Sequence, residues 1–453
     1  MSTIAAIATP AGAGGIGVIR VSGPQAIAVA DRVFFAYSKK KLSQIPGYTA
    51  LYGKVLAGDE MLDEVVALLF RAPKSYTGED VVELSCHGGS YVLSRVLRLL
   101  FAEGCAPAEP GEFTKRAFLN GKMDLTRAEA VMKLISARGN DALQAAVHTL
   151  SGTLKDQTDE ICDLLVTASA SLGVWADYPE EDVPSVQGED LSVSLTRAET
   201  LLSALLSRFD SGQAVTEGVN TVICGKPNVG KSALMNLLTG RERSIVTEVA
   251  GTTRDVIEET VLLGNVLLRL SDTAGIHETG DTVERIGVSR ALERLTNASL
   301  IYAVFDSSRP LDEEDRELIQ RCRGKRCIAV LNKSDLPAKT TAGELSTFFE
   351  NIVEISAQNG EGYEELQQKT EALLGTDGID TAAPMLMNER QYRCCASALQ
   401  DVREAIDALH MGLTFDAVHI SIDSAIDHLL ELTGQKVSDT VVDKIFASFC
   451  VGK

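Results

Sequence analysis

The chain has 453 residues, of which 45% are hydrophobic and 23% charged, and its formal net charge at pH 7 is −20. This length corresponds to about three domains, each able to bury its own core, and the composition is that of an ordinary soluble protein. The negative charge argues against broad electrostatic binding of nucleic acid, so any RNA contact must use a local basic patch or a partner. Nine cysteines without paired CxxC motifs favour a reducing compartment over a disulfide framework or a zinc site.

The N-terminus does not resemble a targeting segment. It carries no Lys or Arg before Arg20, and Pro10 and several glycines interrupt its run of small residues. A signal peptide begins with positive charge and continues with an unbroken apolar segment, and a transit peptide is rich in Arg. We therefore expect a cytoplasmic protein that makes no use of a membrane.

Residues 1–118 predict a small α+β domain. Short apolar runs are separated by Gly and Pro turns, and one helix is expected over 91–103. The expected strands lie in the segments TIAAIA, GVIRVSG, EVVALLF and DVVELSC.

Two features of this first domain imitate functional sites. Gly12, Gly14 and Gly17 have the GxGxxG spacing of a dinucleotide site, but a strand-like VIRV and a Ser-Gly-Pro turn follow them where such a site needs a helix. A Rossmann site is therefore not expected. His87, which two glycines follow, is interpreted as part of a structural turn and not as a metal ligand or nucleophile.

Two helical stretches flank the middle of the chain. From about residue 119 to 211, and again from about 388, apolar residues recur at spacings of three and four. We predict one discontinuous helical domain, 119–215 and 379–453, interrupted by an α/β domain at 216–378 whose two ends can lie close together.

The inserted domain carries four nucleotide-binding signatures in chain order, GKPNVGKS, GTTRD, DTAG and NKSD. The first follows an apolar strand at 222–224 and begins a helix, which is the context in which backbone N–H groups converge on phosphate oxygens. Lys231 should reach the β- and γ-phosphates, and the hydroxyl of Ser232 should coordinate Mg²⁺.

The second and third signatures predict loops that respond to the γ-phosphate. Thr253 of GTTRD can meet Mg²⁺ through its hydroxyl only while that phosphate is present. Asp272 follows a strand at 266–270, as a carboxylate on the Mg²⁺ side should, and Gly275 can turn its N–H toward the γ-phosphate.

The fourth signature selects the base. Asn332, Lys333 and Asp335 follow an apolar strand, and a carboxylate there can accept two hydrogen bonds from guanine that adenine cannot donate. Ser356 and Ala357, after the strand at 352–355, are placed to offer a backbone N–H to the guanine oxygen. The nucleotide is therefore predicted to be GTP.

The glutamine that orients water in small signalling GTPases is missing. Ile276 stands at its position, just after the DTAG glycine, and cannot hold a water molecule. Glu278 and Glu284 in the following segment are candidates, although most glutamates on such a stretch are solvated surface residues.

The whole chain resembles the MnmE (TrmE) family of tRNA-modification GTPases. The resemblance rests on GVIRVSG, YTGEDVVELSCHGG, PGEFTKRAFLNGKMDL, a G domain set between helices, and the terminal FCVGK. It implies a multidomain α/β and α+β fold: an N-terminal α+β domain that binds folate and dimerises, the discontinuous helical domain, and an inserted Ras-like P-loop G domain.

The resemblance also implies a reaction. The homodimer would act with the flavoprotein MnmG (GidA), in a heterotetramer or larger complex, on the wobble uridine of certain tRNAs. A tetrahydrofolate such as 5-formyltetrahydrofolate would supply one carbon toward a 5-carboxymethylaminomethyl or aminomethyl group. By position in the matched motifs, Arg20, Glu83, Lys122 and Lys453 contact the folate, although each could instead be a surface ion pair. Cys450 lies near the folate in the family, but a catalytic role for it does not follow from the sequence.

In the same family a K⁺ ion explains the missing glutamine. Asn228 with Thr247, Val249 and Thr252 would hold the ion, which offsets charge on the phosphates as an arginine finger does. The binding site for the ion would be completed when two G domains meet. The catalytic residues implied are Glu284, which positions water, with Lys231 and Thr252. The full set expected at GTP is Asn228, Val229, Gly230, Lys231, Ser232, Ala233, Thr247, Glu248, Val249, Ala250, Gly251, Thr252, Thr253, Asp272, Thr273, Ala274, Gly275, Asn332, Lys333, Asp335, Ser356 and Ala357, with Mg²⁺ on Ser232 and Thr253.

Two other functions stay open at this point. A ribosome-assembly GTPase would need a basic RNA-binding appendage such as a KH domain, and the acidic chain has no GxxG loop on a basic surface. A non-enzymatic scaffold would use GTP only to switch the affinity of its helices for a partner.

Overall fold

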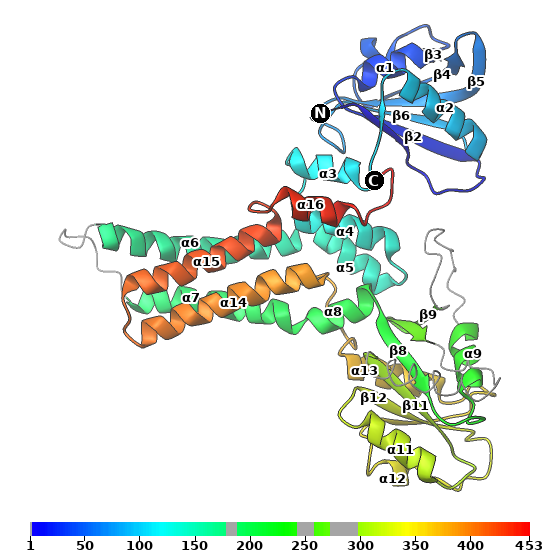
Figure 1. Ribbon diagram of the computed structural model, residues 1–453, viewed down its shortest axis with the longest axis vertical. Helices are drawn as coiled ribbons and strands as arrows, with labels where there is room; N and C mark the ends of the chain where they lie inside the picture. Colours follow the sequence, from blue (N-terminus) through cyan, green and yellow to red (C-terminus); the bar gives the residue numbers. More distant parts are fainter. Residues whose placement is uncertain (1, 178–187, 242–257, 272–297) are drawn as a thin grey trace, which may run out of the picture. The chain divides into compact units, whose positions relative to one another are not determined.

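The computed structural model describes residues 2–177, 188–241, 258–271 and 298–453 (Figure 1). The chain divides into two compact units, one formed by Met1–Met132 with Ile426–Lys453 and the other by Lys133–Ala425. Two helices, α4 (Leu125–Ser136) and α15 (Phe415–Thr433), contain the points at which the units divide. The predicted domain boundaries at 118, 215 and 378 stay predictions.

A seven-stranded sheet forms the first unit. Its strands are β1 (Ile4–Ile7), β2 (Ile16–Ser22), β3 (Phe34–Ala36), β4 (Thr49–Ala57), β5 (Glu60–Phe70), β6 (Val81–His87) and β7 (Ala106–Pro107), in the order β3-β4-β5-β6-β2-β1-β7. Alternate residues of β5, among them Val65, Ala67 and Leu69, are buried, because successive side chains of a strand point to opposite faces. Helices α1 (Ala26–Val33) and α2 (Ser90–Ala102) pack on that buried face.

The prediction of a single helix in this region was wrong. Besides α2, the structure has α1 and α3 (Glu112–Leu119), each of 8 residues, and a short 3₁₀ turn η1 (Leu42–Gln44). Helices this short are marginal in isolation and give only two turns of apolar pattern in the sequence, so burial against the rest of the unit decides their formation. Phe113 and Ala117 of α3, for example, are fully buried.

The last residues of the chain pack against this N-terminal sheet. Helix α16 (Asp439–Phe446) contacts α3, and Phe446 and Phe449 share a core with Leu125. Beyond it, backbone N–H groups of Gly111 and Phe113 donate to the carbonyls of Cys450 (3.3 Å) and Lys453 (3.2 Å).

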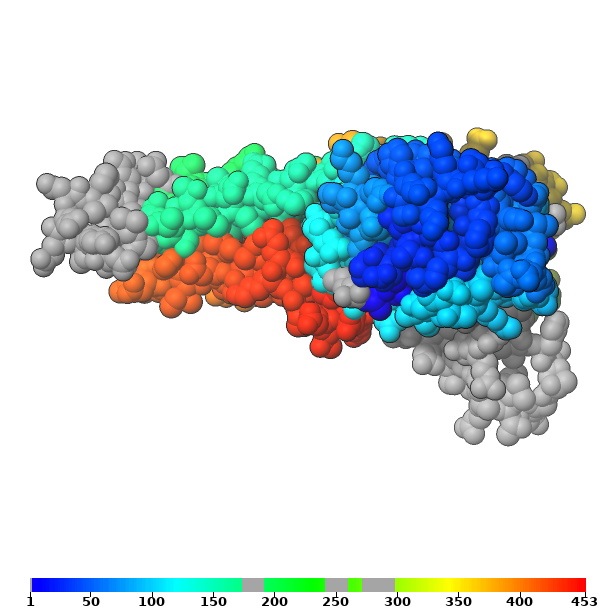
Figure 2. Space-filling model, turned by 90° about the horizontal axis from the view of Figure 1, so that it is seen from above, coloured from blue at the N-terminus to red at the C-terminus, as the bar shows by residue number. Residues whose placement is uncertain are grey.

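Five helices of the second unit show the predicted helical spacing of apolar residues: α5 (Asn140–Ser151), α6 (Thr153–Asp177), α7 (Gly188–Ser207), α8 (Phe209–Thr216) and α14 (Glu389–His410). On α7 the buried residues are Leu191, Leu195, Ala198, Leu202 and Leu205. They face α6 and α14. Helices α6 and α15 lie side by side (Figures 1 and 2), where Ser169 donates to Asp423 (2.8 Å).

The same unit contains a six-stranded sheet. Its strands are β8 (Val219–Cys224), β9 (Glu258–Leu263), β10 (Val266–Ser271), β11 (Leu300–Asp306), β12 (Cys327–Asn332) and β13 (Ile352–Ile355), and its helices are α9 (Lys231–Arg241), α11 (Glu313–Cys322), α12 (Ala342–Leu345) and α13 (Tyr363–Leu374). The order is β13-β12-β11-β8-β10-β9, with only β9 antiparallel to its neighbour.

The central strand β11 is buried along its whole length, as a parallel strand covered on both faces must be. The strands predicted before three of the nucleotide signatures and at 352–355 are all present. Because parallel strands end at one edge, the loops after β8, β11, β12 and β13 meet there, which is where ligands bind in open α/β sheets. Among the described helices, none combines the length and apolar composition needed to cross a bilayer.

Candidate functional site

The loop between β8 and α9 forms a cradle of backbone. Gly225 (φ 154°) and Gly230 (φ 99°) adopt conformations that side chains disfavour. A Cβ atom on Gly225 would lie 2.4 Å from the Val304 carbonyl, and one on Gly230 would lie 2.1 Å from Nδ2 of Asn332. Both positions therefore require glycine, and the loop stays open to phosphate oxygens at the start of α9.

Lys231 points back into this cradle. Its Nζ donates to the carbonyls of Gly225 (2.8 Å) and Lys226 (2.7 Å), so the ammonium lies inside the loop. Ser232 is exposed at the start of α9, and Ala233 packs on the core beneath. The positive charge and the accessible hydroxyl suit a phosphate and its Mg²⁺ ion.

Asn332 joins the phosphate loop to the base loop. Its side chain is buried, Nδ2 donates to the Val229 carbonyl (2.9 Å), and Oδ1 accepts from the Ala357 N–H (3.0 Å). The Ser356 N–H donates to the Glu361 carbonyl (3.1 Å). The N–H groups expected to serve the guanine oxygen are thus both engaged within the protein here, and the amide of Asn332 holds two nucleotide loops in register.

Lys333 is fixed by a carboxylate that sequence reasoning missed. Its Nζ contacts the Asn228 carbonyl (2.8 Å) and Oδ2 of Asp306 (2.6 Å), at the end of β11. Burial acts to raise the pKa of Asp306, but hydrogen bonds from Lys333 and Ser308 outweigh it and hold that pKa below its usual value. An acidic residue directly after an apolar strand was the signal available in the sequence.

Asp335, the predicted guanine acceptor, is exposed at the mouth of the site. Its Oδ1 accepts from the Ser356 hydroxyl (2.7 Å), which orients the carboxylate. A carboxylate held in this way can accept from the two donors on guanine, and adenine would leave it unpaired.

A second unexpected contact ties the phosphate loop to α11. Lys226 Nζ bonds Asp312 (2.6 Å) and Asp315 (2.7 Å), and Asp312 caps the helix by accepting from the N–H of Glu314. Burial acts to lower the pKa of Lys226, but the hydrogen bonds to the two carboxylates outweigh that effect, and the pKa lies above its usual value.

The remaining predicted residues of the nucleotide site lie outside the described residues: Thr247, Glu248, Val249, Ala250, Gly251, Thr252, Thr253, Asp272, Thr273, Ala274 and Gly275, together with Ile276, Glu278 and Glu284. Their roles stay predictions.

A second cluster forms around Arg20 in the first unit. Its Nε donates to Glu83 (2.8 Å), its cross-strand neighbour, and Nη1 donates to the Gly452 carbonyl (3.3 Å). The guanidinium lies 5.5 Å from the ring centres of both Tyr76 and Phe113. The two rings and the Gly452 carbonyl were not anticipated from the sequence.

Other predicted residues lie around this cluster. Lys122 Nζ donates to the Pro73 carbonyl (3.1 Å), in the loop that also carries Tyr76. The carbonyl of Lys453 accepts from the Phe113 N–H, so the chain end is held beside the Arg20 cluster. Cys450 is exposed.

The two imitations of sites involve strands β2 and β6, and His87 is the last residue of β6 where a turn was expected. Gly17 lies within β2, so a strand and not a helix follows the GxGxxG triplet directly. His87 bonds Asp63 through both Nδ1 (2.6 Å) and its backbone N–H (2.8 Å). Across the described ranges, no group of three His, Cys, Asp or Glu side chains could hold a metal ion.

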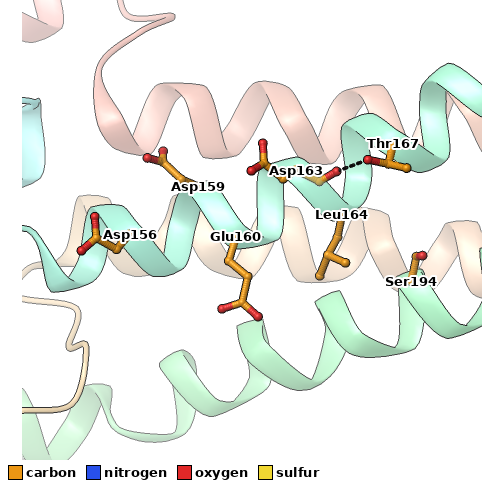
Figure 3. Close-up of a pocket in the computed structure, with 7 residues that line it drawn as sticks. All are labelled: Asp156, Asp159, Glu160, Asp163, Leu164, Thr167 and Ser194. Atoms are coloured by element: carbon orange, nitrogen blue, oxygen red, sulfur yellow. Dashed lines mark hydrogen bonds between the residues drawn. The ribbon is translucent and has the colours of Figure 1, made fainter.

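A cavity of about 570 Å³ on α6 is unsuited to nucleotide (Figure 3). Its lining is Asp156, Asp159, Glu160, Asp163, Leu164, Thr167 and Ser194. Four carboxylates would repel phosphate groups.

A mostly parallel sheet with a glycine cradle, its lysine and an Asn-Lys-Ser-Asp loop at one edge defines a P-loop GTPase. Two family models match the chain, "GTP-binding protein TrmE N-terminus" over residues 3–122 and "MnmE helical domain" over residues 125–450. The chain belongs to the MnmE family of tRNA modification GTPases, which confirms the predicted family and fold class.

Relatives match along the whole length. The tRNA modification GTPase MnmE of Clostridioides difficile is 40% identical, covering 100% of this chain and 99% of the relative. That of Lacticaseibacillus paracasei is 42% identical, covering 100% and 98%. Among solved structures, the G domain of the T. maritima FeoB iron transporter is 28% identical, covering 34% of this chain and 98% of that one, with a TM-score of 0.27. Family membership makes the chain a GTP hydrolase of tRNA modification, with GTP as substrate and Mg²⁺ as its counter-ion.

Proposed function

We propose that this chain is a K⁺-activated GTPase that works with the flavoprotein MnmG. Together they would use a tetrahydrofolate one-carbon unit to form 5-carboxymethylaminomethyl or aminomethyl uridine at the wobble position of certain tRNAs, in the cytoplasm. GTP hydrolysis would drive a motion of the G domains that gates this modification.

The position of Asn228 carries the K⁺ part of the proposal. Its backbone has φ 64°, a left-handed conformation that asparagine tolerates better than most residues. Its carbonyl is held by Lys333, which is itself anchored on buried Asp306. An exposed amide at a fixed point of the phosphate loop is a suitable oxygen ligand for a hard cation.

The remaining ligands of K⁺ would come from Thr247, Val249 and Thr252. The ion would neutralise charge that develops on the phosphates, as an arginine finger does in other GTPases. Lys231 would bind the β- and γ-phosphates, and Glu284 would position the attacking water that Ile276 cannot hold.

The Arg20 cluster fits the folate part of the proposal. A carboxylate and a guanidinium set beside two aromatic rings can bind a planar heterocycle that carries both donors and acceptors. We assign Arg20 and Glu83 to that heterocycle, and Lys122 and Lys453 to the folate carboxylates. When bound, the folate would supply the one-carbon unit. Cys450, exposed two residues before Gly452, is assigned no role.

The open face of the N-terminal sheet supports the homodimer. Phe35, Tyr52 and Val66 are exposed. Strand register places them on one face, because Phe35 pairs with Lys54, two residues from Tyr52, and Tyr52 pairs with Val66. An exposed sheet face that carries aromatic and aliphatic side chains in this way suits a second copy of the chain. The same register brings the Arg20 cluster to this face, since Glu83 pairs with Leu68, two residues from Val66.

The test is GTP turnover by the full chain in KCl and in NaCl at equal ionic strength. Turnover should be much faster in KCl. Asn228→Gly should remove the difference, because glycine keeps φ 64° without strain and deletes only the amide. Equal turnover of the wild-type chain in the two salts would refute K⁺ activation. Loss of the modified wobble uridine in cells lacking the gene tests the tRNA part separately.

A further inference from the structure

Besides the cavity on α6, the structure has one of about 380 Å³ beside α11, outside the nucleotide loops. Its lining is Arg316, Ile319, Gln320, Arg323, Thr347 and Phe348, from α11 and from the turn that follows α12. The N-cap of α11, Asp312, contacts the phosphate loop through Lys226. At 1.5 Å per residue, the lining extends along α11 from about 6 Å beyond Asp312, at Arg316, to about 16 Å beyond it, at Arg323. None of the lining residues belongs to the nucleotide loops.

The cavity combines an apolar floor, an aromatic wall and a polar rim. Arg316, Gln320 and Arg323 recur at i, i+4 and i+7 and therefore share one face of α11. Ile319 beneath them is 8% exposed, whereas the neighbouring Phe348 is 56% exposed. A phenyl ring open to solvent above a buried isoleucine is a platform on which another flat group can stack.

The charge of the cavity is opposite to that of the chain. The protein has 63 acidic and 43 basic residues, yet the lining contains two arginines and no carboxylate. Within the described ranges, neither Arg316 nor Arg323 forms an ion pair. On the same helix, Arg321 is paired with Glu317 and does not line the cavity. Exposed Glu313 and Glu344 stand on the same elements but also outside the lining.

We propose that this cavity binds one nucleotide of the RNA substrate. The base would stack on Phe348 above Ile319, and the phosphates on its two sides would pair with Arg316 and Arg323. Gln320 and Thr347 would offer hydrogen bonds to the base edge. Sequence-tolerant recognition of unpaired nucleotides combines aromatic stacking with cationic contacts to the backbone in this way.

Two features favour RNA over other anions. The guanidinium-bearing residues are separated by about 10 Å along the helix, which suits phosphates on both sides of a base better than one phosphate group. The exposed ring adds stacking, which an acidic peptide does not need. The inference rests on the proposed function, because it takes the tRNA as the substrate whose nucleotide enters the cavity.

The experiment measures the affinity of the full-length protein for an unmodified tRNA transcript by fluorescence anisotropy over a range of salt. Phe348→Ala should weaken binding about tenfold, within the range for loss of one stacked base, and Phe348→Trp should restore it. The double variant Arg316→Gln/Arg323→Gln should weaken binding and reduce the slope of log K against log salt by about 1.4, which is two phosphate contacts on a single strand. Arg321→Gln is the matched control and should bind as wild type does.

The outcomes separate this inference from the proposed function. Wild-type affinity in both pocket variants, or no tRNA binding by the wild-type chain, would overturn it. So would loss of flavoprotein binding with tRNA binding intact, which would make the cavity a protein-docking site. Displacement of tRNA by an equal concentration of mononucleotide would overturn the RNA assignment as well. GTP turnover in KCl and NaCl, measured on the same variants, should equal wild type. If turnover were equal in KCl and NaCl while the cavity variants still weakened tRNA binding, K⁺ activation would be refuted and the nucleotide-binding role of the cavity would be kept.

Discussion

The nucleotide loops and the Arg20 cluster are assembled in opposite ways. The phosphate loop and the NKSD loop are short motifs at the ends of β8 and β12, and one mostly parallel sheet brings them together. Arg20, by contrast, meets Glu83 and Gly452 across separations of 63 and 432 residues. The first site depends on a few hydrogen bonds between loops, whereas the second depends on where the end of the chain packs. Variants that break one of these dependences should leave the other site intact.

The largest effect is expected for Asn332→Ala. It leaves the Val229 carbonyl and the Ala357 N–H without their partner, at a cost of about 3 kcal/mol. Because both loops are proposed to contact the nucleotide, GTP affinity should fall about a hundredfold, as measured with a fluorescent GTP analogue. Asn359→Ala, which changes an exposed asparagine in the loop after β13, is the matched control. Wild-type affinity in Asn332→Ala would show that the loops hold their register without this amide.

Gly452→Ala tests the other region. At φ 94° the new Cβ would lie 2.4 Å from the Ile7 carbonyl, so the chain end must move and Arg20 loses its contact to the Gly452 carbonyl. Alanine in this backbone conformation costs about 2 kcal/mol of strain. The affinity for 5-formyltetrahydrofolate, measured by calorimetry, should therefore fall about thirtyfold. Val451→Ala, which changes an exposed neighbour, should bind normally. Unchanged folate affinity in Gly452→Ala would remove the chain end from the proposed site, and a loss of GTP affinity would refute the independence of the two regions.

This contrast also explains what could be predicted from the sequence. The phosphate loop, its flanking strand and helix, and the base-selecting loop are local patterns, and each has the predicted context. Asp306 was missed because its partner, Lys333, comes from a neighbouring strand whose position no local pattern reveals. Helix α1 was missed because its eight residues owe their conformation to the sheet beneath them. The rings around Arg20 were missed because only the packing of α3 and of the chain end places Phe113 there.

Asp306→Asn should have a smaller effect, confined to the nucleotide region. It leaves Lys333 without its anchor, and charge-assisted hydrogen bonds contribute about 2 kcal/mol, so the free energy of unfolding should fall by about that amount at pH 7. Because the pKa of Asp306 is lowered in the folded state, its contribution is present above the unfolded pKa of about 3.9 and lost as pH falls through the folded value. Urea unfolding of both proteins from pH 7 to pH 3 should therefore show the difference shrinking only at the acid end. A difference that grew toward low pH would contradict the ion pair.

The smallest effect concerns His87, the last residue of β6. A hydrogen bond to Asp63 is the main cause that raises the pKa of His87 above its usual value. Any stabilisation from this pair is present below the unfolded pKa of about 6.5 and is lost as pH rises through the folded value. In an NMR titration His87 should lose its proton above pH 6.5, and Asp63→Asn should lower that midpoint. Since the ring is 72% exposed, the free energy of unfolding should barely change. Added Zn²⁺ should leave the His87 resonances in place, and a specific shift would restore the metal-site interpretation that its contact with Asp63 argues against.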